Sequence, residues 1–317
     1  TPHMEIRAGL QKISFGSAYV FRPLMWFDRM DFRDPLQITE GVYSPLGKYY
    51  FNNNINIWLW TLYGNDKVKG WETVKSVRTT PEFGGRFQVP AGMGDLAISY
   101  HHRKADYTGL MPGVPPATRT EYPEQMVALD GKWDLNIGVW FEAVATRCDS
   151  SVLENRWRRA VTVGADYTFG LGRGLTLLTE HFYFESPTPL GLPATDLRLS
   201  ALVFSYPLGV ADMLTGAVYY EWNREDWFRF VEWRRTYDHW RIHLIGFWNP
   251  DRASVFAVTP PRAWRGPSGK GCSPTPTPTT GTWAGRGPGS GPAASGSSST
   301  GKAAARKRKG KRNPGSD

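Results

Sequence analysis

The chain has 317 residues and a formal net charge of +9, with 40% apolar residues and a mean hydropathy of -0.43. This composition excludes a helical membrane bundle, because no stretch approaches the roughly 18 consecutive apolar residues of a spanning helix. It leaves room for a membrane β-barrel, whose strands span with about 9 to 11 residues, alternate ones polar. The positive charge belongs to the end of the chain. Residues 260–317 hold eleven Lys and Arg against one Asp, so they contribute +10 and residues 1–259 contribute -1.

Apolar and polar residues alternate along most of the chain, which predicts β-strands. About thirteen strands are expected. In chain order they are 6–14, 36–44 followed by a tight turn at 45–48, 48–60, a hairpin over 82–102 turning at 92–94, a hairpin over 126–143 turning at Asp130-Gly131, and hairpins over 160–184, 197–222 and 229–248.

Short turns and longer polar connections alternate between these strands. The longer connections are 16–35, 63–81, 103–120, 144–157, 185–195 and the brief 223–226. Outer-membrane barrels have this layout, with tight turns on one side of the membrane and larger loops on the other. The predicted fold is therefore all-β, an antiparallel up-and-down transmembrane β-barrel of about 14–18 strands when complete, of which this chain holds about thirteen.

The two faces of the predicted strands differ in polarity. In residues 133–143 the apolar Val139, Phe141 and Ala143 alternate with polar or small residues, so one face would meet lipid and the other a lumen. Opposed charges across a lumen set which solutes pass. The alternative for each polar residue is a solvated face without a role in selectivity. The candidate pore-lining residues are Arg7, Gln11, Arg86, Gln88, Asp134, Asn136, Glu142, Asp166, Glu180, Arg198, Glu221, Arg241 and His243.

The densest cluster of charged and aromatic residues is the segment WFDRMDFRDP, residues 26–35. Two interpretations stay open: the loop folds into the pore as a constriction, or Arg to Asp pairs hold it at the rim of the barrel. The candidate constriction residues are Trp26, Asp28, Arg29, Asp31, Arg33 and Asp34.

Several segments resemble bacterial outer-membrane porins, in the broad group that includes alginate-export-type channels. They are GLQKISFG (9–16), RPLMWFDRMDFRDPLQITEGVY (22–43), YYFNNNINIWLW (49–60) and PEFGGRFQVP (81–90), and the resemblance covers roughly residues 5–258. It implies passive transport across the outer membrane and does not specify a solute. Such barrels begin with a signal peptide and further strands, and they close with a strand that ends in an aromatic residue. This chain ends in NPGSD, so we expect it to be truncated at its N-terminus and altered at its C-terminus.

Residues 1–259 are thus expected to form the barrel, and residues 260–317 a disordered, low-complexity basic tail rich in Pro, Gly, Ser and Thr. No catalytic motif, metal-ligand spacing or cofactor motif is present, so we expect no enzyme, metal or cofactor. The run ARKRKGKR (305–312) could bind nucleic acid, but a basic tail without such a partner is preferred.

The expected function is passive diffusion of small hydrophilic solutes, sugars or oligosaccharides among them, through the bacterial outer membrane. The expected partners are outer-membrane lipid and these solutes, and the sequence sets no oligomeric state. The alternative is a soluble all-β protein that binds or cleaves carbohydrate, which would need a second layer over its apolar faces.

Overall fold

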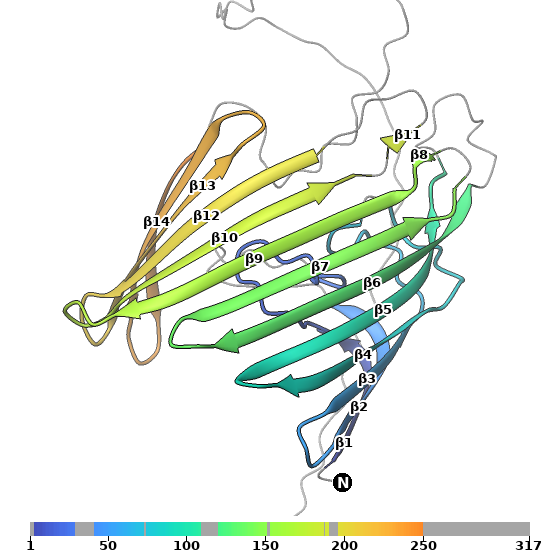
Figure 1. The fold of residues 1–317 in the computed structure, drawn as a ribbon, viewed down its shortest axis with the longest axis horizontal. Coiled ribbons are helices and arrows are strands. Elements are labelled where there is room, and N and C mark those ends of the chain that lie inside the picture. Colours follow the sequence, from blue (N-terminus) through green and yellow to red (C-terminus); the bar gives the residue numbers. More distant parts are fainter. Residues whose placement is uncertain are drawn as a thin grey trace, which may run out of the picture. The chain divides into compact units, whose positions relative to one another are not determined.

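The computed structural model describes residues 3–28, 41–72, 74–108, 120–150, 153–186, 188–189 and 196–249. The predicted tail, 260–317, lies outside these residues. Within them the chain is built of strands (Figure 1), and no helix occurs in these ranges. The strands are β1 Met4–Gln11, β2 Val42–Tyr50, β3 Asn56–Leu62, β4 Glu82–Ala91, β5 Gly94–Asp106, β6 Glu121–Asp134, β7 Gly138–Cys148, β8 Leu153–Asn155, β9 Trp157–Phe169, β10 Leu175–Glu185, β11 Thr188–Pro189, β12 Asp196–Pro207, β13 Asp212–Glu221, β14 Asp226–Thr236 and β15 Arg241–Trp248.

Thirteen of these strands form one sheet in the order β1-β2-β3-β4-β5-β6-β7-β9-β10-β12-β13-β14-β15. Each pairs antiparallel with the strand before and after it in this order. The predicted number of strands and their up-and-down order are therefore confirmed. The short β8 and β11 pair separately, within a connection.

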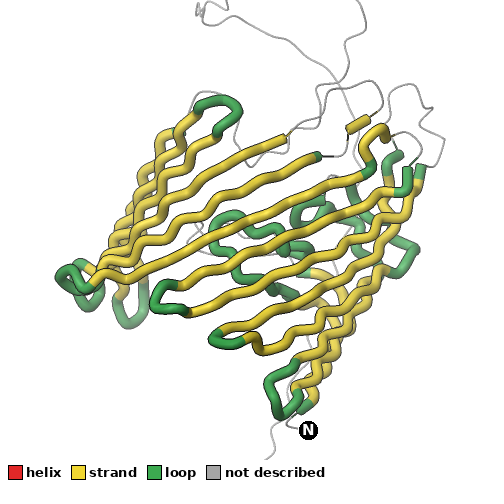
Figure 2. The backbone as a smooth tube through the Cα atoms, in the orientation of Figure 1, coloured by secondary structure: helices red, strands yellow, loops and turns green. Residues whose placement is uncertain are grey.

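Short turns join the strands at one end of the sheet, and the longer connections lie at the other, as predicted. The turns are residues 51–55, 92–93, 135–137, 170–174, 208–211 and 237–240. Figure 2 shows these turns as green caps on the strands, which run side by side and curl as a sheet. In the described part of the chain β1 and β15 each have a partner on one side only, so the sheet is open and the expected closed barrel is not seen.

The turn predicted at Asp130-Gly131 is wrong. Both residues lie inside β6, opposite Glu142 and Phe141 of β7. The chain turns instead at residues 135–137, where Asn136 has a φ of 71°. An asparagine adopts this left-handed conformation more readily than most residues, so the local turn preference of Asn136 competes with that of Asp130-Gly131. Ion pairing of Asp130, described below, favours its place within the strand.

The turn predicted at 45–48 is also wrong, because these residues lie within β2 and pair with β1. The chain turns at residues 51–55, where Asn54 has a φ of 64° and the side-chain oxygen of Asn53 accepts a hydrogen bond from Ile55 N over 3.4 Å. The strand boundaries near this turn therefore move by several residues from the predicted 36–44 and 48–60.

The two faces of the sheet are covered differently. We call inner the face that bears Trp60, Asp130, Glu142, Glu180 and Tyr219, all of which are buried. The opposite, outer face bears many exposed apolar side chains. What buries the inner face is the chain itself: residues 12–28, which follow β1, run across it, and we call them the inner segment. In Figure 2 they form green loops behind the strands.

Apolar contacts fix the inner segment to the sheet in two clusters. Phe15, Leu24 and Trp26 pack with residues of β2, β3, β6 and β7. Phe21 stacks on Phe182 of β10, with ring centroids 5.4 Å apart, in a cluster with residues of β9, β12, β13 and β14. Burying one such aromatic side chain contributes about 1.5–3 kcal/mol. The clusters therefore span most of the sheet's width.

Candidate functional site

Two carboxylates of the inner face hold the inner segment through its backbone. Glu142 accepts hydrogen bonds from Ala18 N at 2.8 Å and Leu24 N at 3.0 Å. Glu180 accepts three from consecutive residues, Tyr19 N at 2.6 Å, Val20 N at 3.0 Å and Phe21 N at 2.7 Å. Successive backbone N–H groups that converge on one anion form a strong, charge-assisted contact. Side chains of the strands thus accept the hydrogen bonds of backbone N–H groups that belong to no strand.

Gly16 allows the inner segment to approach Glu142. A Cβ at this position would overlap the carboxylate oxygen Oε1, and the φ of Gly16 is +96°, a value that other residues rarely adopt. The path of the inner segment therefore depends on a glycine placed directly over the carboxylate that binds it.

The last described residues of the inner segment are buried beside aromatic rings. Phe27 packs edge-on against Trp60 and His101, with centroids 5.6 and 5.0 Å apart. Asp28 is 4% exposed, and Lys12 Nζ lies 3.8 Å from its Oδ2. Burial raises the pKa of Asp28 above its ordinary 3.8, although Lys12 and Arg22 oppose the shift. The carboxyl group thus carries an energetic cost when it ionises in the folded chain.

A hydrogen-bonded chain of side chains lies under this aromatic cluster. Trp60 Nε1 donates to His101 Nδ1 over 3.2 Å, and His101 Nε2 lies 3.1 Å from Glu82 Oε2. The indole nitrogen can only donate, so Nδ1 is the acceptor and Nε2 carries the proton that is given to Glu82. This fixes the orientation of a buried histidine.

Part of the long connection between β3 and β4 also folds onto the inner face, and we call it the second loop. Its Lys69, Glu72 and Ser76 join a buried polar network with residues of β4, β5 and β6. Lys69 Nζ lies 2.8 Å from Glu82 and 3.3 Å from Glu72, and Arg103 lies 3.2 Å from Glu72 and 2.6 Å from Glu124. Burial raises the pKa of Glu72, against the opposing effect of Arg103 and Lys69. Removing one partner of such a buried pair costs about 3–5 kcal/mol, because the other charge stays unpaired.

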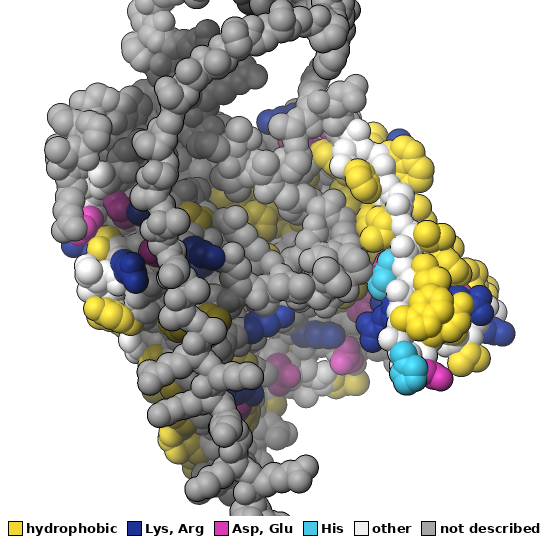
Figure 3. All heavy atoms as spheres, turned by 180° about the vertical axis from the view of Figure 1, so that it is seen from behind, with side chains coloured by type: hydrophobic (Ala, Val, Ile, Leu, Met, Phe, Trp, Pro, Cys, Tyr) yellow, Lys and Arg dark blue, Asp and Glu magenta, His cyan; other side chains and the backbone are white. Residues whose placement is uncertain are grey.

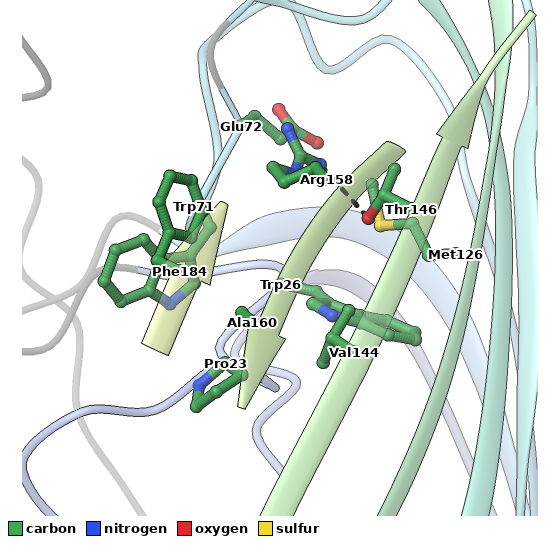
Figure 4. A pocket seen from close by; sticks show the side chains of 10 residues that line it. All are labelled: Pro23, Trp26, Trp71, Glu72, Met126, Val144, Thr146, Arg158, Ala160 and Phe184. Carbon is green, nitrogen blue, oxygen red and sulfur yellow. Dashed lines mark hydrogen bonds between the residues drawn. The ribbon is translucent and has the colours of Figure 1, made fainter. Parts of the chain in front are cut away.

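The inner segment and this second loop leave a small cavity between them and the sheet. Figure 4 shows it, lined by Pro23 and Trp26 of the inner segment, Trp71 and Glu72 of the second loop, and side chains of the strands. Its volume of about 20 Å³ holds roughly one water molecule. The inner segment, the second loop and the strands that line this cavity are therefore closely packed.

A larger cavity of about 360 Å³ lies on the other side of the inner segment, near the short turns. Phe15, Gly16 and Ser17 form one wall, and residues of β3, β4, β5 and β6 form the rest. The strand residues that line it are Trp58, Arg86, Gln88, Asp95, Leu96, Ala97, Asp130 and Lys132. The larger, polar cavity and the small cavity thus lie on different sides of the inner segment.

The strand pairing shows where the predicted pore-lining residues lie. Eleven of the thirteen are at positions that face the inner side: Arg7, Gln11, Arg86, Gln88, Asp134, Glu142, Asp166, Glu180, Glu221, Arg241 and His243. Asn136 lies in the turn between β6 and β7. Arg198 pairs with Tyr183 and takes the outer face, because its neighbours Leu199, Ala201 and Val203 are buried on the inner face.

The reason for the misplaced Arg198 is the packing of the inner face. Placing Arg198 in the lumen requires the apolar residues of β12 to face lipid. Instead, Leu199, Ala201 and Val203 face inward and belong to the aromatic cluster around Phe21. Other predicted inner residues serve the inner segment: Glu142 and Glu180 bind its backbone. Whether any of the eleven lines a pore stays a prediction.

The candidate constriction residues divide into two groups. Trp26 and Asp28 are buried at the inner face, 5% and 4% exposed. Arg29, Asp31, Arg33 and Asp34 lie outside the described residues, so the two interpretations of 26–35 stay open for that part. The described part, residues 26–28, lies against the inner face of the sheet.

Several residues of the site were missed by sequence reasoning. The sequence predicts a turn at Asp130, and it predicts a connecting loop, without a site, at Lys69 and Glu72. Arg103 and Glu124 continue the alternation of inner and outer residues along β5 and β6. Extending this alternation by a few residues would place both side chains on the inner face. Their partners come from elements far along the chain, which no local pattern indicates.

The outer face is apolar and uncovered by the described residues. Leu59 of β3, Ile98 of β5, Val163 of β9 and Leu202 of β12 are between 49% and 63% exposed. Figure 3 shows hydrophobic side chains gathered over the last strands of the sheet, at the right of the view. Exposed apolar surfaces are typical of faces that contact a membrane or a partner, which makes the outer face a candidate contact surface.

No helix in the described ranges is long and apolar enough to cross a membrane. Comparison of the sequence with protein-family models gave no match, and a search of curated proteins gave none either.

Proposed function

We propose that the chain is part of an outer-membrane channel for small hydrophilic solutes, a porin-like β-barrel whose lumen the inner segment narrows. One observation carries this proposal: the sheet is apolar and exposed on its outer face and charged and buried on its inner face. Side chains such as Leu59 and Val163 are exposed, while Arg86, Glu142 and Glu180 are buried. Membrane barrels have this reversed arrangement, because lipid solvates the outer face and polar groups collect inside.

The up-and-down order and the alternation of short turns with long connections support the same proposal. In lipid an open sheet edge leaves backbone groups unsatisfied at several kcal/mol each. The proposal therefore requires that the free edges of β1 and β15 are paired in the membrane, by further strands or by each other.

The inner segment supplies the constriction in this proposal. It crosses the inner face between the cavity of about 360 Å³ and the small cavity of about 20 Å³. A solute would have to pass around it, and its charged surroundings, among them Arg86 and Asp130, would select by charge and hydrogen bonding.

The alternative of a soluble carbohydrate-binding or carbohydrate-cleaving protein requires a second layer over the outer face. The described residues provide cover for the inner face only. A soluble form would expose the apolar band of β3, β5, β9 and β12 to water, an aggregation hazard for a monomer.

The experiment that tests the proposal is refolding of the full chain into detergent micelles and into lipid vesicles. We expect β-sheet circular dichroism, a band on SDS gels that moves faster unboiled than boiled, and discrete conductance steps in planar bilayers. A monomer that is soluble without detergent and melts cooperatively, with no conductance, would overturn the proposal.

A further inference from the structure

Glu142 and Glu180 are buried carboxylates that hydrogen bonds hold in place of ion pairs. Glu142 is 0% and Glu180 1% exposed. In the described part of the chain, neither side chain forms an ion pair with a Lys, Arg or His. Backbone N–H groups of the inner segment donate five hydrogen bonds to the two carboxylates. The inner segment is therefore the main partner of both charges.

Every oxygen of the two carboxylates accepts from an N–H group. Glu180 Oε1 accepts from Tyr19 N and, over 3.0 Å, from Trp140 Nε1, while Oε2 accepts from Val20 N and Phe21 N. The two oxygens of Glu142 accept one bond each. A proton on any of these oxygens would turn an O–H donor toward an N–H donor, so hydrogen bonds to the inner segment would be weakened or lost.

The charged groups around Glu142 do not replace these bonds. Asp130 of β6 lies opposite Glu142 and is paired with Arg86. Arg22 of the inner segment acts on Glu142 through its charge, but its guanidinium donates within its own segment, to Ser14 Oγ over 3.1 Å and to the carbonyl oxygen of residue 15 over 3.4 Å. Glu142 therefore depends on backbone N–H groups for direct contacts.

Glu180 has fewer charged groups around it. It lies opposite Gly164 of β9 and Ala201 of β12. The inner face of β12 bears no charged residue, and the neighbouring inner position on β9, next to Gly164, is the acid Asp166. No positive charge from these strands is thus placed to hold Glu180 when the inner segment leaves.

The inner segment is anchored on both sides of residues 18–24 by contacts that do not use these carboxylates. Phe15 and Trp26 pack against each other, with centroids 5.5 Å apart, in the cluster with β2, β3, β6 and β7. Burial favours the neutral form of Asp28 beyond Trp26, so acid does not loosen that end. Residues 18–24 form the part whose contacts depend on charged carboxylates.

We infer that the inner segment is an acid-released gate, in which protonation of Glu142 and Glu180 frees residues 18–24 from the sheet and widens the lumen. N–H donors favour the charged form of a carboxyl group, so the docked segment and the protons oppose each other, and each weakens the other's binding. The inference rests on the proposed function, to which it adds the regulation of the constriction.

The test is hydrogen-exchange mass spectrometry on the full chain refolded in detergent micelles, from pH 8 to pH 4. Results are compared as protection factors, which divide out the direct effect of pH on amide exchange. We expect protection over residues 18–21 and at Leu24 to fall at least tenfold towards pH 4, while β7 and β10 keep theirs.

Single variants separate the two carboxylates. Glu180→Gln should give low protection over residues 19–21 at every pH, and Glu142→Gln should do so at Ala18 and Leu24 while residues 19–21 keep their pH response. Glu185→Gln is the control, because it removes a carboxyl group from β10 without touching the inner segment, and it should behave as the parent does. If a Gln variant fails to fold, the parent and the control still decide.

Protection that is equal at both ends of the pH range, or that falls alike in β7 and β10, would overturn the inference. The same holds if Glu185→Gln abolishes the response. Single-channel conductance tests the channel separately, and it should rise as pH falls. A pH response in micelles without any bilayer conductance would overturn the proposed function and support the acid-released segment. Conductance without a pH response of residues 18–24 would overturn the gate and support the channel.

Discussion

Arg86 and Asp130 form a two-point ion pair across the inner face, with the guanidinium nitrogens 2.6 and 2.8 Å from the carboxylate oxygens. Arg86 lies on β4 and Asp130 on β6, so the pair crosses β5, whose Ser99 joins it at 3.1 Å. Both residues are buried. The pair links three strands of the sheet beneath the inner segment, and it is strong only while both charges are present.

Asp130→Asn should therefore destabilise the fold strongly. The variant keeps the shape of the side chain but leaves the buried Arg86 charge unpaired, at a cost of about 3–5 kcal/mol. Urea unfolding of the refolded protein, followed by tryptophan fluorescence, measures the loss. Asp134→Asn is the control, because Asp134 is exposed on the same strand and should cost less than about 0.5 kcal/mol. Equal midpoints for the two variants would show that the pair contributes little.

Glu180→Gln should release the part of the inner segment that it binds. An amide offers one acceptor in place of two and turns an N–H group toward Tyr19, Val20 or Phe21, so charge-assisted bonds worth about 1.5–3 kcal/mol each are weakened or lost. Hydrogen-exchange mass spectrometry should show exchange over residues 19–21 at least tenfold faster.

Glu185→Gln is the control for this change, since Glu185 lies on the same strand and contacts Asn155 and Arg159, away from the inner segment. If the inner segment narrows the lumen, Glu180→Gln should also raise single-channel conductance and Glu185→Gln should not. Unchanged exchange in Glu180→Gln would mean that apolar contacts alone hold residues 19–21.

Asp28→Asn should remove a pH dependence of stability. Burial raises the pKa of Asp28, so ionisation is less favourable in the folded chain than in the unfolded chain. The contribution of Asp28 to stability is thus fully present below its ordinary pKa of 3.8 and is lost as pH rises through the raised value. An asparagine does not ionise, so the variant should be more stable than the parent at pH 7.

The measurement is the urea midpoint of parent and Asp28→Asn from pH 3 to pH 8. The two curves should meet near the acid end and separate as pH rises. A variant less stable than the parent at pH 7 would mean that the Lys12 contact, at 3.8 Å, outweighs the cost of burial.

The fold could be predicted from sequence to the level of its strands because period-2 alternation is a local property. Thirteen strands and their antiparallel order follow from it. The turns could not all be placed, since Asp130-Gly131 and Asn136 are both good turn residues six positions apart. The ion pair between Arg86 of β4 and Asp130 of β6 keeps Asp130 within the strand, so the chain turns at Asn136 instead.

The site was less predictable, for a physical reason. Glu180 and its backbone partners lie about 160 residues apart in the chain, and Glu142 and Ala18 lie 124 apart. Nothing in the local sequence shows that a loop after β1 folds inward to meet them. For the same reason the apolar residues of β12 were assigned to lipid, when Phe21 and its neighbours cover them.

The outer face gives the sharpest test of the membrane setting. Val163 lies near the middle of β9 and is 49% exposed among other apolar residues of the outer face. Val163→Arg would place a charge in the hydrocarbon region of the bilayer, at about 2–4 kcal/mol, and should lower the yield of heat-modifiable protein in lipid vesicles. Val210→Arg is the matched control, because Val210 is fully exposed in a short turn outside the apolar band. It should insert as well as the parent, since a charge near the interface costs about 0–1 kcal/mol. Both variants should fold alike if the chain is a soluble protein, because a surface arginine is then neutral at either position.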